Sequence, residues 1–179
     1  MHHDRSFTAA AIQQSCSPDR EANLAHSARL IENAAQRGAD LLVLQELHTG
    51  PYFCQEEAAD VFDRAEPIPG PTTRYLGELA AELGVVIVGS VFEKRMAGVH
   101  HNTAVVLDSD GSLAGTYRKM HIPDDPGFYE KFYFTPGDAT PDSFRPIKTS
   151  LGRLGVMVCW DQWYPEAARL MALAGAEVL

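Results

Sequence analysis

The sequence predicts an α/β fold. Segments with helical periodicity alternate with short apolar runs that have the character of strands, and glycines separate them. One pattern occurs twice, because residues 33–46 and 169–179 each join a helix end to an apolar run through Gly-Ala and an acid. This repeat favours two sheets or half-sheets with related packing. The 179 residues, 45% of them hydrophobic and 22% charged, suit one globular domain spanning residues 1–179.

The N-terminal part predicts a strand followed by an amphipathic helix. Residues 7–13 are rich in apolar side chains and form the strand candidate. Ser17 is expected to cap the helix, with Pro18 in the first turn, where its missing N–H is harmless. Gly38 ends the helix, and the predicted buried face consists of Leu24, Ala28, Ile31 and Ala35.

The middle of the chain predicts further strands around a second helix. The continuous apolar run at residues 41–46 is typical of a strand that is covered on both faces. A helix over residues 72–83 and a buried strand over residues 85–93 repeat the same plan. Residues 103–108 and 112–119 flank a Ser-Asp-Gly turn, which predicts a hairpin.

The C-terminal part predicts a long loop, a strand pair and a helix. Residues 120–139 are rich in Pro, Gly and aromatics without a pattern, and a loop of that length in a compact domain is usually functional. Residues 144–149 and 153–159 form the predicted strand pair. Residues 165–174 form the helix, whose predicted buried face is Ala167, Leu170, Met171 and Ala174. Residues 177–179 resemble the start of another strand, so we expect the domain to continue beyond them.

The composition limits the classes of partner. A formal net charge of −9 and a pI near 5.1 argue against nucleic acid, because phosphate binding needs a basic face. No apolar run approaches the roughly 20 residues of a membrane span, and the N-terminal stretch lacks the apolar core of a signal peptide. Cys16, Cys54 and Cys159 give no disulfide framework. We therefore expect a cytoplasmic protein that binds a small molecule, with no nucleic-acid or membrane partner.

Three chemically capable residues each stand at the end of a predicted strand. Cys159 lies between a strand and a helix, where a helix N-terminus stabilises a thiolate, although free cysteines are often buried core residues. Glu46 and Lys119 also end strands, where position alone favours a solvated surface charge for each. Together they supply a nucleophile, a base and a cationic donor for an oxyanion, which acyl transfer from an amide requires.

Three segments resemble the nitrilase superfamily of carbon–nitrogen hydrolases. Residues 41–54 (LLVLQELHTGPYFC) resemble its glutamate segment, and residues 115–138 (GTYRKMHIPDDPGFYEKFYFTPGD) its lysine segment. Residues 156–179 (VMVCWDQWYPEAARLMALAGAEVL) resemble its nucleophile segment. The three occur in the family's order and, with the strands between them, cover nearly the whole chain. The sequences of the long loop and of the nucleophile segment look closest to those of the branch that hydrolyses the ureido group of a carbamoylated diamine.

The resemblance implies a role for each matching residue. Cys159 would be the nucleophile, Glu46 the general base and Lys119 the stabiliser of the oxyanion. Glu130 matches the family's additional glutamate, which helps to position the substrate and supports the lysine. The backbone N–H of Trp160 would be the second oxyanion donor. The implied reaction uses no cofactor.

Tyr52 and Asp125 are further substrate-binding candidates. Tyr52 could line the pocket, yet aromatic side chains more often fill cores. Asp125 could meet a substrate ammonium, or simply belong to a Pro-flanked surface turn. Adjacent residues such as His100 and His101 point to opposite faces of a strand and chelate poorly, so we expect no metal site. His121 is expected to make a polar contact within the loop.

The family's fold is an α-β-β-α sandwich, of which this chain would form the N-terminal part. By ordinary domain sizes the fold extends roughly 100 residues beyond residue 179, and the full-length protein is expected to be a homo-oligomer. Two alternatives stay open: a hydrolase of another N-carbamoyl or ω-amide substrate, and a catalytically incomplete chain that acts as an interaction subunit. A nucleotide-binding domain is excluded because the sequence has no Gly-rich phosphate loop.

Overall fold

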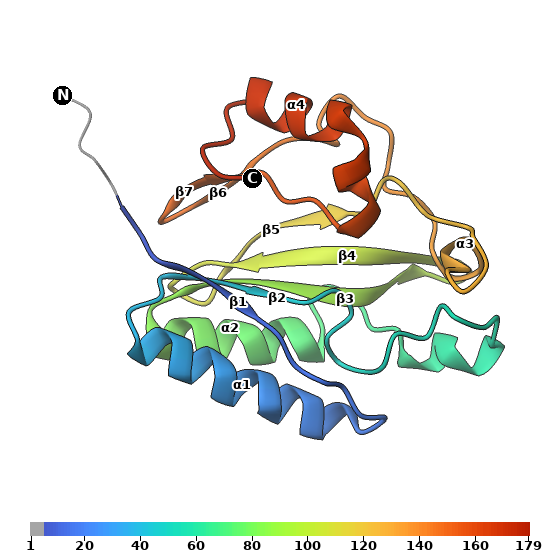
Figure 1. Ribbon diagram of the computed structural model, residues 1–179, viewed down its shortest axis with the longest axis horizontal. Helices are drawn as coiled ribbons and strands as arrows, with labels where there is room; N and C mark the ends of the chain where they lie inside the picture. Colours follow the sequence, from blue (N-terminus) through green and yellow to red (C-terminus); the bar gives the residue numbers. More distant parts are fainter. Residues whose placement is uncertain (1–5) are drawn as a thin grey trace.

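The centre of the molecule is a five-stranded sheet (Figure 1), seen in a computed structural model that describes residues 6–179. Its strand order is β1-β2-β3-β4-β5, with bounds Ala9–Ile12, Leu41–Leu44, Val86–Met96, Val99–Leu107 and Leu113–Arg118. The first three strands run parallel, and β4 and β5 each pair antiparallel with their predecessor. Residues 1–5 of the predicted domain lie outside the described residues.

Two helices cover one face of this sheet. Helices α1 (Arg20–Gln36) and α2 (Pro71–Leu83) lie side by side below the sheet in Figure 1. The predicted apolar stripe of α1 is buried at Leu24, Ala28 and Ile31. The predicted cap was wrong by two residues, because the side chain of Asp19 accepts the hydrogen bond from Ala22 N at 3.0 Å.

The C-terminal segment covers the opposite face of the sheet. It contains a small antiparallel sheet of β6 (Ile147–Thr149) and β7 (Gly152–Leu154), the 3₁₀ helix η2 (Cys159–Trp163) and helix α4 (Pro165–Leu173). Figure 1 shows these elements above the main sheet. Ile147 and Leu154 pack against Val86, Val88 and Val106 of the main sheet. The order of layers is therefore helix, sheet, small sheet and helix, as the resemblance implies.

The second layer differs from the prediction in its strand lengths. The predicted strands 144–149 and 153–159 are reduced to β6 and β7, and residues 155–158 leave the ladder before Cys159. The N–H of Gly155 instead donates to Val178 O at 2.8 Å, and Leu154 and Val178 form a parallel bridge. The expected strand character around Val178 is thus confirmed. Val178 pairs with the backbone at residues 154–155, where the pairing between β6 and β7 ends.

Some residues predicted to be buried are exposed. Ala167 and Met171 of α4 are buried, whereas Leu170 is 45% exposed and Ala174 is also exposed. Val43 of β2, predicted to be covered on both faces, is 40% exposed. These side chains are exposed because no segment among residues 6–179 packs over them.

The long loop after β5 is anchored by aromatic packing. Apart from the single helical turn α3 (Glu130–Tyr133), the segment 120–139 is irregular, as expected. Tyr133 and Phe134 join the buried apolar cluster that contains Phe53 and Phe92, and the 3₁₀ helix η1 (Ala59–Arg64) borders it. This packing fixes Glu130, the first residue of α3, beside the end of β5. None of the helices within the described range has the length and apolarity that a membrane span requires.

Candidate active site

Lys119 is the centre of a buried cluster of charges. It follows the last residue of β5, and its side chain is 0% exposed. Its ammonium lies 2.9 Å from Glu46 Oε1 and 2.6 Å from Glu130 Oε2. Burial alone would lower the pKa of Lys119, but the two carboxylates outweigh it and raise the pKa, so the ammonium stays charged. Two carboxylates, 73 and 11 residues away from Lys119 in the sequence, therefore meet at its ammonium.

Glu46 is held in place from the neighbouring strands. Asn102 of β4 is fully buried and donates from Nδ2 to Glu46 Oε1 at 2.6 Å. The next residue, Leu47, has a φ of +51° and donates its N–H to Ser90 Oγ of β3 at 3.0 Å. Ser90 Oγ in turn lies 3.4 Å from Asn102 Oδ1. Both hydrogen bonds to Glu46 end on Oε1, so among residues 6–179 Oε2 is left to act on a proton.

Sequence reasoning missed Asn102 and Ser90, although a signal was available. Both are buried polar residues inside strands: Ser90 is next to the buried Val91, and Asn102 lies between the buried His101 and Thr103. A buried polar side chain needs a hydrogen-bond partner, so its position in a strand points to a built polar site.

Glu130 and Tyr52 form the other side of the cluster. The Tyr52 hydroxyl donates to Glu130 Oε1 at 2.9 Å, while the second carboxylate oxygen accepts from Lys119. Burial raises the pKa of Glu130, and the Lys119 ammonium opposes that rise. The structure therefore places Tyr52 and Glu130 in one cluster with Lys119 and Glu46.

Cys159 occupies a strained position at the start of η2. Its φ is +47°, in the left-handed region that residues with a side chain rarely adopt, and the residue is exposed. Partial burial of the sulfur and the negative charge of Glu46 raise the pKa of the thiol to about 11, against the opposing pull of Lys119. The direction of this pKa differs from the expected stabilisation of a thiolate, because burial and the Glu46 carboxylate both favour the protonated thiol.

The remaining candidates are Trp160 and Asp125, and they differ in their local structure. Trp160 is the second residue of η2, where a backbone N–H has no partner within the helix. Asp125 lies in an exposed turn, in which its backbone oxygen accepts a hydrogen bond from Phe128 N at 2.7 Å. Among the described residues, no hydrogen bond joins the Asp125 side chain to the cluster around Lys119. The turn interpretation of Asp125 therefore fits its local structure.

Two histidines make polar contacts outside the cluster. His121 Nδ1 lies 2.6 Å from Asp161 Oδ1, so its polar contact is with η2 and not within the loop as expected. His101 Nδ1 lies 2.7 Å from Thr135 O. No group of three or more His, Cys, Asp or Glu side chains within residues 6–179 is arranged to hold a metal ion.

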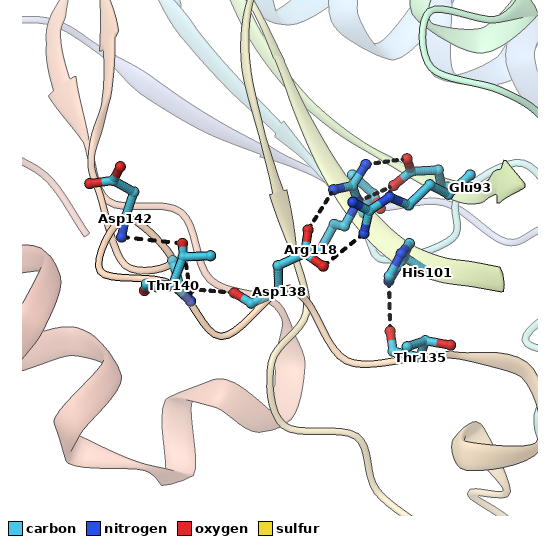
Figure 2. A network of polar contacts seen from close by, with 10 residues as sticks. Glu93, His101, Arg118, Thr135, Asp138, Thr140 and Asp142 are labelled. Carbon is cyan, nitrogen blue, oxygen red and sulfur yellow. Dashed lines mark hydrogen bonds and ion pairs between the residues drawn. The ribbon is translucent and has the colours of Figure 1, made fainter.

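A second cluster of charged side chains stabilises the end of β5, next to Lys119. Arg118, the residue before Lys119, donates to both carboxylate oxygens of Glu93 at 2.8 and 2.6 Å and lies 3.5 Å from Asp138 (Figure 2). Thr103 Oγ1 also donates to Glu93. Burial raises the pKa of Glu93, but the Arg118 and Thr103 hydrogen bonds outweigh it and hold the pKa below its usual range. The ion pair links β3, β5 and the loop at residue 138.

Comparison with known proteins identifies the family of the chain. The family model of carbon-nitrogen hydrolases matches residues 8–179, so the chain belongs to that family, and the resemblance to the nitrilase superfamily is confirmed. It is similar to the N-carbamoylputrescine amidase of Solanum lycopersicum, with 49% identity over 98% of this chain. It is also similar to the citrullinase of Francisella tularensis, with 41% identity over 95% of this chain.

A solved structure confirms the fold. The carbon-nitrogen hydrolase from Helicobacter pylori G27 superimposes with a TM-score of 0.90 and 52% identity, over 96% of this chain and 58% of that one. The chain likewise spans 58% of the length of both curated relatives. The chain therefore has the fold of the matching part of a carbon–nitrogen hydrolase.

The Glu93 ion pair yields a stability prediction. Glu93→Gln should lower the free energy of unfolding by about 1–3 kcal/mol at neutral pH, because Arg118 loses its charged partner. The lowered pKa means that ionised Glu93 stabilises the fold above the unfolded-state pKa of about 4.3, and that this contribution is lost as the pH falls through the folded-state pKa. The difference in the free energy of unfolding between wild type and variant should therefore become smaller at acid pH.

Urea unfolding of wild type and variant across this pH range measures the effect. Glu21→Gln is the matched control, because Glu21 is 81% exposed in its pair with Arg20 and should change stability by less than about 0.5 kcal/mol. Equal effects of the two substitutions at neutral pH would contradict the assignment.

Proposed function

We propose that the complete protein hydrolyses the ureido group of N-carbamoylputrescine to putrescine, carbon dioxide and ammonia, through an intermediate linked to Cys159. The observation that carries this proposal is the buried Lys119 ammonium held between Glu46 and Glu130. Relatives with the printed name N-carbamoylputrescine amidase, at up to 49% identity, support the choice of substrate.

The first step forms the covalent bond. Because its pKa is raised, Cys159 is a thiol at neutral pH and needs a base. Glu46 accepts the thiol proton, and the sulfur attacks the ureido carbonyl carbon. Glu46 then gives the proton to the terminal nitrogen, the bond between that nitrogen and the carbonyl carbon breaks, and ammonia leaves. The carbonyl group and the diamine attached to it stay on Cys159 as a thiocarbamate.

Lys119 stabilises the negative charge that develops on the carbonyl oxygen. An ammonium has three donor hydrogens, and the hydrogen bonds to Glu46 and Glu130 use two of them. The third is available for the oxyanion, and the N–H of Trp160 supplies the second donor. A donor of this kind typically lowers the barrier by about 3–4 kcal/mol.

The second step releases the diamine. Glu46 takes a proton from water, and the resulting hydroxide attacks the thiocarbamate carbon. The carbon–sulfur bond breaks, and the sulfur regains a proton from Glu46. The released carbamate loses carbon dioxide and leaves putrescine. One water is consumed for each ammonia, carbon dioxide and diamine produced.

The choice between substrates rests on charge. A product diamine favours acids near the site, and the net charge of −9 and the Glu130 carboxylate agree with a cationic substrate. The alternative is another N-carbamoyl or ω-amide substrate, because a relative of 41% identity is named a citrullinase. The interaction subunit, the homo-oligomer and the cytoplasmic location stay predictions.

Ammonia release by the complete protein tests the proposal, with N-carbamoylputrescine beside N-carbamoyl-β-alanine. Cys159→Ala should abolish turnover, and Lys119→Met should lower kcat by about 10²–10³-fold, because the oxyanion loses its cationic donor. Lys148→Met, at an exposed position of β6, is the matched control and should keep wild-type activity. Normal ammonia release by Cys159→Ala would refute the mechanism, and faster turnover of N-carbamoyl-β-alanine would refute the substrate.

The raised thiol pKa gives a second prediction. The rate of Cys159 alkylation by iodoacetamide should keep rising past about pH 8.5, where an ordinary thiol is half ionised, towards the pKa of about 11. Glu46→Gln should move this profile to lower pH, because a carboxylate that disfavours the thiolate is removed.

Peptide mass after brief labelling separates Cys159 from the half-buried Cys16 and the buried Cys54. A wild-type profile with its midpoint below about pH 8.5, or no change in Glu46→Gln, would contradict this electrostatic account of the thiol.

A further inference from the structure

We propose that Asp161 is a positioning residue that sets the separation between Cys159 and Lys119. The inference rests on the proposed function for the roles of those two residues. The Asp161 side chain is 0% exposed, yet sequence reasoning assigned it no role. It lies two residues after Cys159 and makes hydrogen bonds to both segments that must meet at the reacting carbon.

The carboxylate of Asp161 is fully used by these contacts. Oδ2 accepts from Val158 N at 3.0 Å and from the Tyr117 hydroxyl at 2.9 Å. Oδ1 accepts from His121 N at 3.0 Å and lies 2.6 Å from His121 Nδ1. Because four donors surround it, the buried charge is compensated and the side chain has one defined orientation.

The contact with Val158 closes the turn that contains Cys159. Val158 N donates to the Asp161 side chain, and Asp161 N donates back to Val158 O at 3.1 Å. This reciprocal pair encloses Cys159 and Trp160. A left-handed φ of +47° is unfavourable for a residue with a side chain and persists only where its surroundings impose it. The carboxylate of Asp161 is a fixed partner that imposes it.

The other contacts reach the chain on both sides of Lys119. Tyr117 lies in β5 two residues before the lysine, and His121 lies two residues after it. Lys119 is itself fixed at the backbone, since its N–H donates to Asn102 O at 2.9 Å and its carbonyl accepts from Gly137 N at 3.0 Å. One carboxylate therefore connects the turn of the nucleophile to the strand end of the cation.

Neighbouring packing makes this connection stiff. The His121 ring stacks on Tyr164, with centroids 3.8 Å apart and an interplanar angle of 11°. Tyr164 ends η2 and precedes α4. Val158 and Tyr117 belong to the same buried apolar cluster as Met171 of α4. A shift of the Cys159 turn relative to β5 would break hydrogen bonds and stacking together.

Asp161 acts on position and takes no part in proton transfer. The charged groups that influence the Cys159 thiol are Glu46, Lys119 and Glu130. The four contacts already occupy both oxygens of Asp161, which leaves it no open direction toward a reacting atom. Its loss should therefore reduce the rate of the chemical step while substrate binding is retained.

The test compares kcat and KM of the complete protein on N-carbamoylputrescine. Asp161→Asn keeps the shape but replaces one acceptor oxygen with a donor, which opposes the N–H of Val158 or of His121. We expect kcat to fall about 10–100-fold, because a misplacement near 1 Å can cost 10² in rate, with KM within about 3-fold of wild type as uniform binding persists. Tyr117→Phe removes one of the four contacts and should give a smaller loss of kcat.

Asp108→Asn is the matched control. Asp108 also accepts several hydrogen bonds, from Ser109 N and from the N–H and hydroxyl of Ser150, but it follows the far end of β4. This variant should keep wild-type kcat even if its melting temperature falls. The melting temperature of each variant and the labelling of Cys159 by iodoacetamide are measured in the same samples.

The outcomes separate this inference from the proposed function. Wild-type kcat in folded Asp161→Asn, or an equal loss in Asp108→Asn, overturns the positioning role. If Asp161→Asn does not fold, Tyr117→Phe decides, and unchanged kcat in that variant overturns the role. Turnover in Cys159→Ala would instead refute the proposed function, because the nucleophile assignment would fail whatever Asp161 does.

Discussion

The site depends on one buried cation. The Lys119 ammonium has no exposure to water, and an unpaired ammonium in such a position would lose its proton or destabilise the fold. Glu46 and Glu130 make the charged form favourable. Because β5 follows two antiparallel steps, it runs in the same direction as β2, and the carboxyl ends of both strands lie at one edge of the sheet. The topology therefore delivers Glu46 and Lys119 to the same place, and the long loop adds Glu130.

The same cluster explains why Cys159 is held as a thiol. Burial and the Glu46 carboxylate both raise the pKa of the thiol, and in the proposed mechanism the same carboxylate accepts the thiol proton. Asn102 and Lys119 bind Oε1 of Glu46, so among residues 6–179 Oε2 is left for that proton. In this proposal, the thiol is activated when substrate binding brings the carbonyl carbon to the sulfur.

Much of the fold could be predicted from local patterns. The stripe of α1 and the buried run of β3 follow from periodicity within single elements. The errors arose where the pattern was incomplete. The apolar run at residues 153–159 resembles one strand, but Gly155 pairs with Val178, and Cys159 starts η2 with a positive φ. The exposure of Leu170 depends on which segment packs against α4, and an amphipathic pattern alone does not show that.

The site could be predicted less completely than the fold. Glu46, Lys119 and Cys159 stood out because each ends a strand and carries reactive chemistry. Asn102 and Asp161 did not, because their partners lie 56 and 44 residues away in the sequence, at Glu46 and Tyr117. A side chain that acts only through its contacts leaves no local signal beyond its burial.

A crystal structure of the complete protein with Cys159→Ala bound to N-carbamoylputrescine would test the central claim most directly. The account predicts that the ureido carbonyl oxygen lies within hydrogen-bond distance of Lys119 Nζ, at about 2.7–3.1 Å, while Nζ keeps its contacts with Glu46 and Glu130. A carbonyl oxygen bound elsewhere, with Lys119 contacting only the two carboxylates, would contradict the account and reduce the lysine to a structural ion pair.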